Sequence, residues 1–448
     1  MRQIMKFTRT FGHLIAATGL AAACTETTSE TATGPTCTQQ AGTICTVAGT
    51  GTAGLGHDDV APTEVLLYLP QDVTPSDDGK QLYIADWNNH RIRVVEDGKV
   101  KTLIGTGYLG DAPDGPALGT SLNHPTHITF SPTGKLIVSA WHNSKVLEVD
   151  LASNTLKAIC GTGARSYGGD GGPADKAVLD LPVAVDYDSE GRMVISDQAN
   201  QRLRRVEKDG TIDTIAGPPK DFVPDGFEKV TPEGAAPKFC KKPTDPAAPA
   251  PTDSRLADGT VNNACLPQPV FPQGFSGDGG PAKGALMSQS FGQQAPPSGR
   301  LEIGPDDTIY FADTFNHRVR AVDAEGMIRT FAGSGPATFD ATYAGGYEGD
   351  GGPAVSAKLK GPVDVAVSDT GKVFIADTQN SCVRVVGTDG IIDTFAGVCG
   401  QRKFGGDGGA ADVAFLNRPY GVALDGLGNL YIADTHNHRI RVVYGAGN

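Results

Sequence analysis

The residues of this sequence best suited to chemistry share one position of a repeating pattern. In chain order that position holds Asp72, His127, Ala184, Arg300, Asp364 and Gly421. Because Ala and Gly are tolerated there, packing alone does not require the four ionisable residues. Asp72, His127 and Asp364 could hold a divalent metal, Ca²⁺ or Zn²⁺, which would activate water or polarise a carbonyl group. Arg300 opposes this hypothesis, because it adds a positive charge at the same position.

A second candidate site combines indole and imidazole rings. Trp87 and Trp141, the only two tryptophans, occupy matching turn positions in neighbouring copies of the repeat. Indole rings stack on sugars and other planar ligands, and polar groups then fix the orientation of the ligand. The candidate ligand-binding residues are Trp87, Trp141, His124, His127, His142 and Arg300. The alternative is that both indoles fold over neighbouring loops and the histidines face solvent.

These residues are positioned by a segment that recurs six times. Its last copy, Leu430 to Val443, reads LYIADTHNHRIRVV. Earlier copies begin at Leu82, Leu136, Met193, Ile309 and Val373. Each copy alternates apolar and polar residues around an Asn-containing turn, which predicts two short antiparallel strands. A strand opened by Pro precedes most copies, and a strand ending in Ala-Gly follows many of them, which makes four strands in each unit. Four strands repeated six times predict an all-β, six-bladed β-propeller.

The residues shared by all turns are interpreted as structural. Asn tolerates positive φ and bonds its own backbone, which explains an Asn in every turn. The Asp that recurs before the turn, as at Asp434, is expected to bond within the turn as well. The Asp-Gly-Gly loops lack the alternating carboxylates of a calcium-binding loop. We therefore assign these loops to turn chemistry.

The two ends of the repeat region complement each other. Thr43 to Gly49 reads like a fourth strand without the first three, and the last repeat stops at Tyr444 just after a third strand. We predict that this N-terminal strand completes the last blade and closes the ring, which leaves no open sheet edge.

The unit resembles the NHL repeat. The likeness covers residues 43–444 and includes the recurring YIADTxNHRIR pattern, with GDGGPA loops such as Gly169 to Ala174. The resemblance implies a β-propeller, often six-bladed. It implies function less specifically, because the family includes binding domains, sensor ectodomains and a few lyases and lactonases.

The N-terminal segment has the features of a targeting signal. Residues 1–23 combine basic residues with a short apolar core, and Ala21 to Ala23 precede Cys24. This end resembles a bacterial lipobox, which implies that Cys24 is lipidated and anchors the protein to the cell envelope. Thr25 is not the Asp that retains many such lipoproteins in the inner membrane, so we expect the outer membrane. Residues 24–42 then form the lipidated tether, and residues 445–448 a short tail.

Export permits disulfide bonds among the remaining cysteines. We predict three pairs: Cys382 with Cys399, Cys240 with Cys265, and Cys37 with Cys45. Cys160 would remain a buried, inert thiol. The pair of Cys240 and Cys265 would close a Pro-rich insertion at residues 218–274. This insertion contains no copy of the repeat, so we interpret it as a surface loop outside the ring, with a lid or a docking element as the alternative.

The charge balance restricts the partners. Removing three basic residues with the signal leaves 35 Lys and Arg against 51 Asp and Glu. This acidic body argues against nucleic acid and against contact with anionic membrane other than through the lipid. We expect a monomer, without a resident cofactor, that binds an envelope or extracellular protein, peptide or glycan. The alternative is a metal-dependent lyase, lactonase or other hydrolase at the channel mouth.

Overall fold

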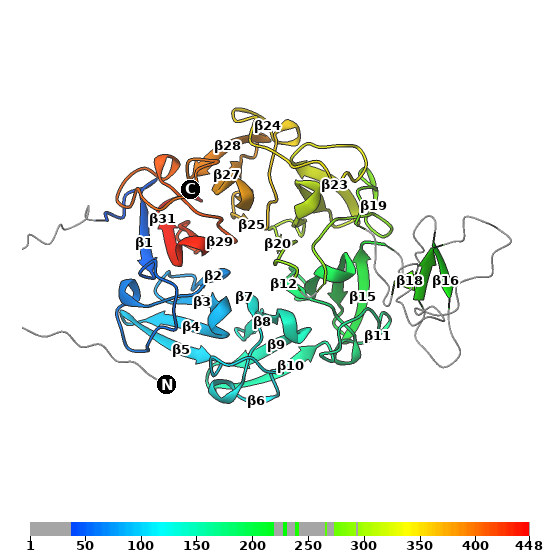
Figure 1. Cartoon of the computed structure of the whole chain (residues 1–448), viewed down its shortest axis with the longest axis horizontal. Coiled ribbons are helices and arrows are strands. Elements are labelled where there is room, and N and C mark those ends of the chain that lie inside the picture. The colour runs from blue at the N-terminus through cyan, green and yellow to red at the C-terminus, as the bar shows by residue number, and fades with distance from the viewer. Residues whose placement is uncertain are drawn as a thin grey trace, which may run out of the picture. The chain divides into compact units, whose positions relative to one another are not determined.

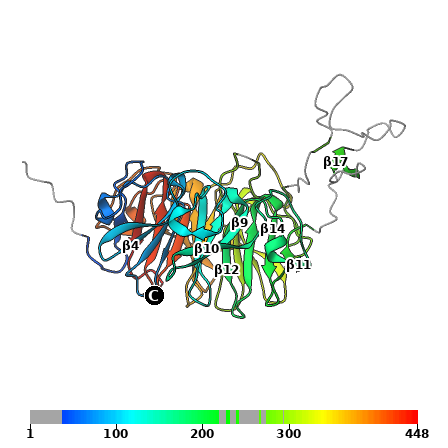
Figure 2. The same ribbon diagram turned by 90° about the horizontal axis from the view of Figure 1, so that it is seen from below.

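Six β-sheets form a ring in this computed structural model, which describes residues 37–218, 273–292 and 294–447 and the backbone of three further strands. Figure 1 shows the ring with one strand of each sheet bordering a central channel, and the side view in Figure 2 shows strands of neighbouring sheets running between two opposite faces. The chain is therefore an all-β, six-bladed β-propeller, as predicted.

Each blade is built from four antiparallel strands. The innermost strands are β2 (Asp72–Pro75), β7 (Pro125–Phe130), β12 (Pro182–Tyr187), β20 (Leu301–Ile303), β25 (Asp364–Val367) and β29 (Gly421–Leu424). The second strands are β3 (Leu82–Asp86), β8 (Leu136–Ala140), β13 (Met193–Asp197), β21 (Ile309–Asp313), β26 (Val373–Asp377) and β30 (Leu430–Asp434). The third strands are β4 (Arg91–Glu96), β9 (Lys145–Asp150), β14 (Arg202–Val206), β22 (Arg318–Val322), β27 (Cys382–Val386) and β31 (Arg439–Val443). The fourth strands are β5 (Lys99–Ile104), β10 (Thr155–Cys160), β15 (Thr211–Ala216), β23 (Met327–Ala332), β28 (Ile391–Ala396) and β1 (Ile44–Ala48).

Short elements complete the blades. Two-residue strands extend four sheets at the rim: β6 (Gly115–Pro116), β11 (Gly172–Pro173), β19 (Gly280–Pro281) and β24 (Gly352–Pro353). Single 3-10 turns follow the blade-to-blade loops: η1 (Pro62–Glu64), η3 (Ala117–Gly119), η5 (Ala174–Lys176), η8 (Ala354–Ser356) and η10 (Ala411–Val413). Others join second to third strands: η2 (Trp87–Asn89), η4 (Trp141–Asn143), η6 (Gln198–Asn200), η7 (Thr314–Asn316), η9 (Thr378–Asn380) and η11 (Thr435–Asn437). We call the side with these last turns the Asn-turn face, and the opposite side the Gly-turn face.

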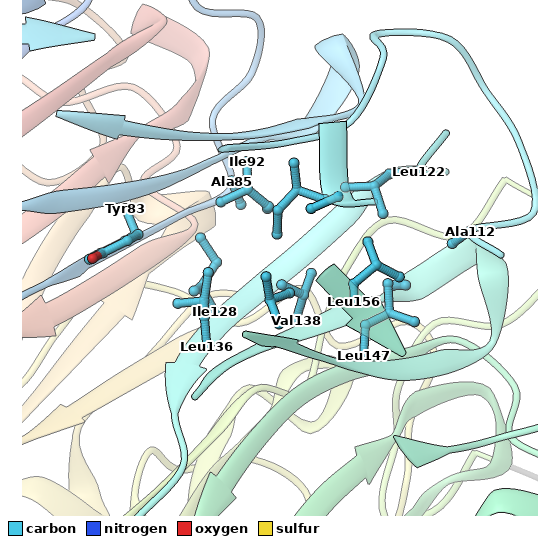
Figure 3. Packing of buried hydrophobic residues seen from close by; sticks show 14 of the residues in the cluster. Tyr83, Ala85, Ile92, Ala112, Leu122, Ile128, Leu136, Val138, Leu147 and Leu156 are labelled. Carbon is cyan, nitrogen blue, oxygen red and sulfur yellow. The ribbon is translucent and has the colours of Figure 1, made fainter. Parts of the chain in front are cut away.

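The core lies between blades, since a sheet buries its faces only against its neighbours. Every residue of a second strand such as β30 is buried, while fourth strands such as β23 alternate between exposed and buried residues. Six clusters of buried apolar side chains accordingly occupy the six blade interfaces. Figure 3 shows the interface of blades 1 (β2–β5) and 2 (β6–β10), where Ile92 of blade 1 lies near Ile128 and Val138 of blade 2.

Blade 6 combines the two ends of the repeat region. β1 pairs antiparallel with β31, with Ile44 opposite Val443 and Cys45 opposite Val442. The Thr46 hydroxyl donates to Asp407 at 2.7 Å, the same bond that Thr214 makes to Asp170 within blade 3 (β11–β15). β1 therefore supplies the fourth strand of blade 6 in both backbone pairing and side-chain contacts.

The Asn turns have a different backbone from the one we predicted. The residue after Asn, as at His90 and His438, takes the left-handed conformation, whereas Asn itself closes the 3-10 turn. The Asn89 amide instead donates to Asp86 Oδ2 and to the carbonyl of Gly54, both at 2.8 Å. The structural role of Asn is confirmed, but it comes from bridging a turn to a loop.

The cysteines of the ring follow the predicted pattern. Cys37 is bonded to Cys45 and Cys382 to Cys399, while Cys160 is a free, buried thiol. Burial raises the pKa of Cys160 to about 12, which keeps the thiol protonated and inert.

The insertion between blades 3 and 4 (β19–β23) contains a small sheet of β16 (Phe227–Val230), β17 (Lys238–Lys241) and β18 (Cys265–Leu266). Its backbone register places Cys240 opposite Cys265, but their side chains, like residues 1–36 with Cys24, lie outside the described residues. No helix within the described ranges is long and apolar enough to cross a membrane.

Candidate functional site

Arg300 occupies the centre of the ring near the Asn-turn face. Its guanidinium is fully buried and donates to Asp72 Oδ1 at 3.4 Å and to Asp364 Oδ2 at 3.3 Å. It also donates to the carbonyls of Thr126 at 2.5 Å and Tyr420 at 3.3 Å. These four partners belong to blades 1, 2, 5 (β24–β28) and 6, so one side chain from blade 4 connects five blades. Arg300 is therefore a structural centre, and the prediction that it contacts a ligand is wrong in this conformation.

The two carboxylates beside Arg300 are also committed to the ring. Asp72 Oδ2 accepts the N–H of Ile128 at 2.9 Å, and Asp364 Oδ2 accepts the N–H of Val422 at 3.1 Å. Each Asp thus bridges its own inner strand to the next. Burial raises the pKa of Asp364 to about 7, although Arg300 opposes this shift.

The predicted metal triad does not assemble as a metal site. Arg300 lies within ion-pair distance of both Asp72 and Asp364, so the carboxylates face a cation that the protein supplies. Across the described part of the chain, no group of three or more His, Cys, Asp or Glu side chains could hold a metal ion. The third predicted ligand, His127, accepts the N–H of Val185 at Nδ1, 3.5 Å away. Burial lowers its pKa to about 4, which keeps the imidazole neutral.

A cavity of about 250 Å³ occupies the channel among the inner strands. Its lining includes Asp186 and Glu302, two residues further along their strands than Ala184 and Arg300, where other blades carry Thr74, Thr129, Ala366 and Ala423. Burial raises the pKa of Asp186 to about 6 and that of Glu302 well above its ordinary value. Asp186 also accepts the N–H of Ile303 at 2.7 Å. We did not predict Asp186 and Glu302 from the sequence, although they could have been found by comparing the six copies two residues after the position that holds Ala184 and Arg300.

Five blades share a network of one buried Arg, one buried Asp and one partly exposed Asp. The Arg at the third residue of the third strand lies between the turn Asp and a blade-to-blade loop Asp. These arginines are Arg93, Arg204, Arg320, Arg384 and Arg441. In blade 4, for example, Arg320 is 2.6 Å from Asp278 and 3.6 Å from Asp313. The recurring carboxylates are therefore structural, as predicted.

Blade 2 has lost this network. Ala140 and Leu147 stand where the other blades carry the turn Asp and the Arg. Elsewhere the turn Asp accepts a backbone N–H from the preceding loop, as Asp197 does from Asp180 at 2.8 Å. Here Asn143 Oδ1 accepts that bond from Asn123 at 2.9 Å instead. The turn keeps its shape without the charged pair, and it is the turn that carries Trp141 and His142.

Four of the predicted ligand residues gather on the Asn-turn face of blades 1 and 2. The ring centroids of Trp87 and Trp141 are 6.4 Å apart, and His124 lies 4.3 Å from Trp87. His142 stacks on Trp141 at 4.1 Å and meets His124 at 5.0 Å. We call Trp87, His124, Trp141 and His142 the aromatic cluster. His127 and Arg300 are not part of it, because both belong to the channel.

The imidazoles of the cluster are neutral. Burial is the largest cause and lowers the pKa of His124 to about 3 and that of His142 to about 4, with neighbouring basic side chains as the smaller cause. His90, which sequence reasoning missed, adds an edge contact 4.4 Å from His124. Its Nδ1 accepts the backbone N–H of His124 at 3.3 Å, as His438 does for Leu69 at 3.1 Å. His90 therefore links blade 1 to blade 2, and its role is structural because His438 makes the equivalent bond in another copy of the repeat.

The two tryptophans differ in exposure. Trp141 is 1% exposed, packs in the core between blades, and donates from Nε1 to Gln198 Oε1 at 3.1 Å. It cannot offer a ring face to a ligand, so the picture of two stacking indoles is wrong for Trp141. Trp87 is half-buried, and its Nε1 has no hydrogen-bond partner among the described residues. His142 Nε2 is buried and unpaired in the same way.

The architecture defines the class of protein as a six-bladed β-propeller with a channel blocked by ion pairs and one modified blade. The model of the NHL repeat matches residues 359–386 and 416–443, so the chain contains NHL repeats in its last two blades.

Among curated relatives, Teneurin-m of Drosophila melanogaster is 24% identical over 425 residues, covering 88% of this chain and 13% of that protein. NHL repeat-containing protein 2 of Gallus gallus is 24% identical over 396 residues, covering 86% of this chain and 48% of the relative. The chain thus spans less than half the length of either relative. Among solved structures, an auxiliary nutrient binding protein from Bacteroides ovatus superposes with a TM-score of 0.53 at 14% identity, covering 90% of this chain and 76% of that one. This likeness concerns the fold.

Proposed function

We propose that this protein is a non-enzymatic binding propeller that recognises a neutral glycan on the Asn-turn face of blades 1 and 2. The observation that carries the proposal is the exchange in blade 2, where Ala140 and Leu147 replace the buried ion pair and Trp141 and His142 enter the turn. Residues that break a repeat without a structural reason mark functional positions.

The chemistry of the aromatic cluster suits a neutral ligand. Trp87 is half-buried and offers an indole for stacking, and the imidazoles of His124 and His142 are neutral. Trp87 Nε1 and His142 Nε2 lack partners, so hydroxyl or carbonyl oxygens of a ligand that reaches them would relieve two unpaired polar atoms. The nutrient-binding role of a propeller with the same fold is consistent with this assignment.

The same arrangement weighs against catalysis at the Asn-turn end of the channel. Arg300 and its carboxylates are buried and mutually paired there, so a substrate would have to break the centre of the ring to reach them. A lyase or hydrolase at this end would therefore have to sacrifice blade contacts in every cycle.

The binding proposal is tested by calorimetry with neutral oligosaccharides in the presence of a chelator. We expect Trp87→Ala to weaken binding about five- to tenfold, since loss of a stacking indole costs about 1–1.4 kcal/mol. Leu427→Ala is the matched control, because Leu427 is 60% exposed in a turn on the Gly-turn face. Equal affinities for Trp87→Ala and Leu427→Ala would refute the site, and binding of peptides alone would replace the glycan by a protein partner.

We also propose that the propeller acts outside the cytoplasm, anchored to the outer membrane by a lipid on Cys24. The proposal rests on the sequence of residues 1–24, and on an acidic body with disulfide bonds that need an oxidising compartment. Globomycin should cause the unprocessed precursor to accumulate, and Cys24→Ser should release the protein from membranes. A Cys24→Ser protein that stays in the membrane fraction would contradict lipid anchoring.

A further inference from the structure

The aromatic cluster contains two imidazole nitrogens that face each other. His124 Nδ1 and His142 Nδ1 are 3.1 Å apart, and Asn123 Oδ1 is 2.8 Å from His124 Nδ1. In this arrangement one imidazole donates its single hydrogen and the other nitrogen accepts it. Three donor atoms of the types that ligate transition metals therefore meet within one hydrogen-bonding distance of His124 Nδ1.

The separation of the two nitrogens suits chelation. Zinc–nitrogen bonds of about 2.0–2.1 Å place two cis ligands about 2.9–3.4 Å apart for angles between a right angle and a tetrahedral one. The 3.1 Å contact lies within that interval. A metal ion beside the pair could replace the shared hydrogen if both rings turn so that their Nδ1 lone pairs point at it, and the displaced hydrogen would move to Nε2 of the imidazole that had donated it.

The groups around the pair have partners of their own. His90 is engaged by the backbone N–H of His124, and Arg165 is paired with Asp180 at 2.7 Å. The elements next to the pair therefore hold their positions through contacts of their own.

We propose that His124 and His142 chelate a divalent transition-metal ion, Zn²⁺, Ni²⁺ or Cu²⁺, through their Nδ1 atoms, with Asn123 Oδ1 as an adjoining oxygen donor. Imidazole nitrogen favours these ions over Ca²⁺ and Mg²⁺. With two imidazoles and one amide, the ion keeps open positions for water or for an oxygen of a bound molecule. This site is separate from the channel, and it does not depend on glycan binding.

The position of the tryptophans makes the site directly measurable. The chain has two tryptophans, Trp141 is stacked on His142, and Trp87 lies 4.3 Å from His124. Cu²⁺ and Ni²⁺ quench indole emission at short range, so intrinsic tryptophan fluorescence reports on this cluster and on no other part of the chain. The experiment titrates untagged, metal-free protein with Cu²⁺, Ni²⁺ and Zn²⁺ in turn, without any organic ligand.

We expect saturable quenching by Cu²⁺ at one molar equivalent, and an increase in melting temperature with Zn²⁺. His124→Ala and His142→Ala should each weaken binding at least about tenfold, because loss of a second-shell partner alone can cost that much. His436→Ala is the control, since His436 is a half-buried histidine stacked on Tyr420 in blade 6. Circular dichroism checks that each variant is folded.

Metal affinity that is unchanged in both His124→Ala and His142→Ala would overturn the proposal, as would an equal loss in His436→Ala. If the alanine variants fail to fold, His142→Gln retains a polar side chain of similar reach, and quenching by Cu²⁺ that persists in it at wild-type affinity would also overturn the site. Because no glycan is present, a negative result here leaves the proposed binding function to its own test.

Discussion

Removing the guanidinium at the centre of the ring should destabilise the whole propeller. In Arg300→Met, Asp72 and Asp364 would keep side chains that are 3% exposed but lose the cation 3.3–3.4 Å away. Breaking a buried ion pair by removing one partner costs about 3–5 kcal/mol. The carbonyls of Thr126 and Tyr420 lose a donor as well, which adds about 1 kcal/mol each. We therefore expect the free energy of unfolding in urea to fall by about 5–7 kcal/mol.

The pH dependence of this loss provides an internal check. Arg300 lowers the pKa of Asp364, which burial has raised to about 7, so its removal raises that pKa further. A carboxyl whose folded pKa exceeds its unfolded pKa contributes most stability at low pH and loses it as pH rises through the folded value. The deficit of Arg300→Met should therefore be smallest near about pH 5 and largest near about pH 8.

A triple variant separates electrostatics from packing. Adding Asp72→Asn and Asp364→Asn to Arg300→Met removes the unpaired charges while keeping oxygens for the N–H groups of Ile128 and Val422. We expect this variant to recover more than half of the lost stability and to lose the pH dependence. A single Arg300→Met variant within about 1 kcal/mol of the wild type at pH 8, near the worth of one surface pair, would refute the reasoning.

Three further outcomes follow from the same contacts. Trp141→Ala should lower the free energy of unfolding by about 3–5 kcal/mol, because it empties a buried site, whereas Trp87→Ala should lower it much less. Chemical denaturation followed by circular dichroism measures both losses, and equal losses would contradict the difference in burial. Deleting the chain through β1 should lower the melting temperature far more than deleting only the residues before β1, because only the first truncation opens blade 6. Equal melting temperatures by calorimetry would exclude closure of the ring by β1. The folded state lowers the pKa values of His124 and His142, so the free energy of unfolding should fall as the pH drops from about 6.5, the ordinary pKa of histidine, toward about 4. A variant that combines His124→Gln and His142→Gln should flatten that part of the curve of unfolding free energy against pH.

The sequence predicted the fold because one segment is repeated. Six copies specify strand order, blade count and the closure, and the buried second strands follow from their continuous apolar character. It predicted the gathering of Trp87 and Trp141 for the same reason, since matching positions of adjacent repeats lie on one face.

What the sequence could not provide was the direction and reach of individual side chains. Arg300 looked like a channel-mouth group, but its long side chain crosses the ring to carbonyls and carboxylates of other blades. Trp141 looked like a partner of Trp87, yet Gln198 holds it in the core. Asn143 takes over the acceptor role of a missing Asp, which no spacing rule reveals.

The pairing of β1 with β31 also has a consequence for the order of folding. Ile44 is opposite Val443, so β1 is synthesised long before β31 and has to wait for it before blade 6 can form. Such contacts between distant parts of a chain slow folding, because a long loop is closed before they contribute stability. The intermediate blades can assemble by local pairing while the ring stays open. Closure is then a late, single event, and any factor that holds the N-terminal strand apart would keep the whole propeller unfinished.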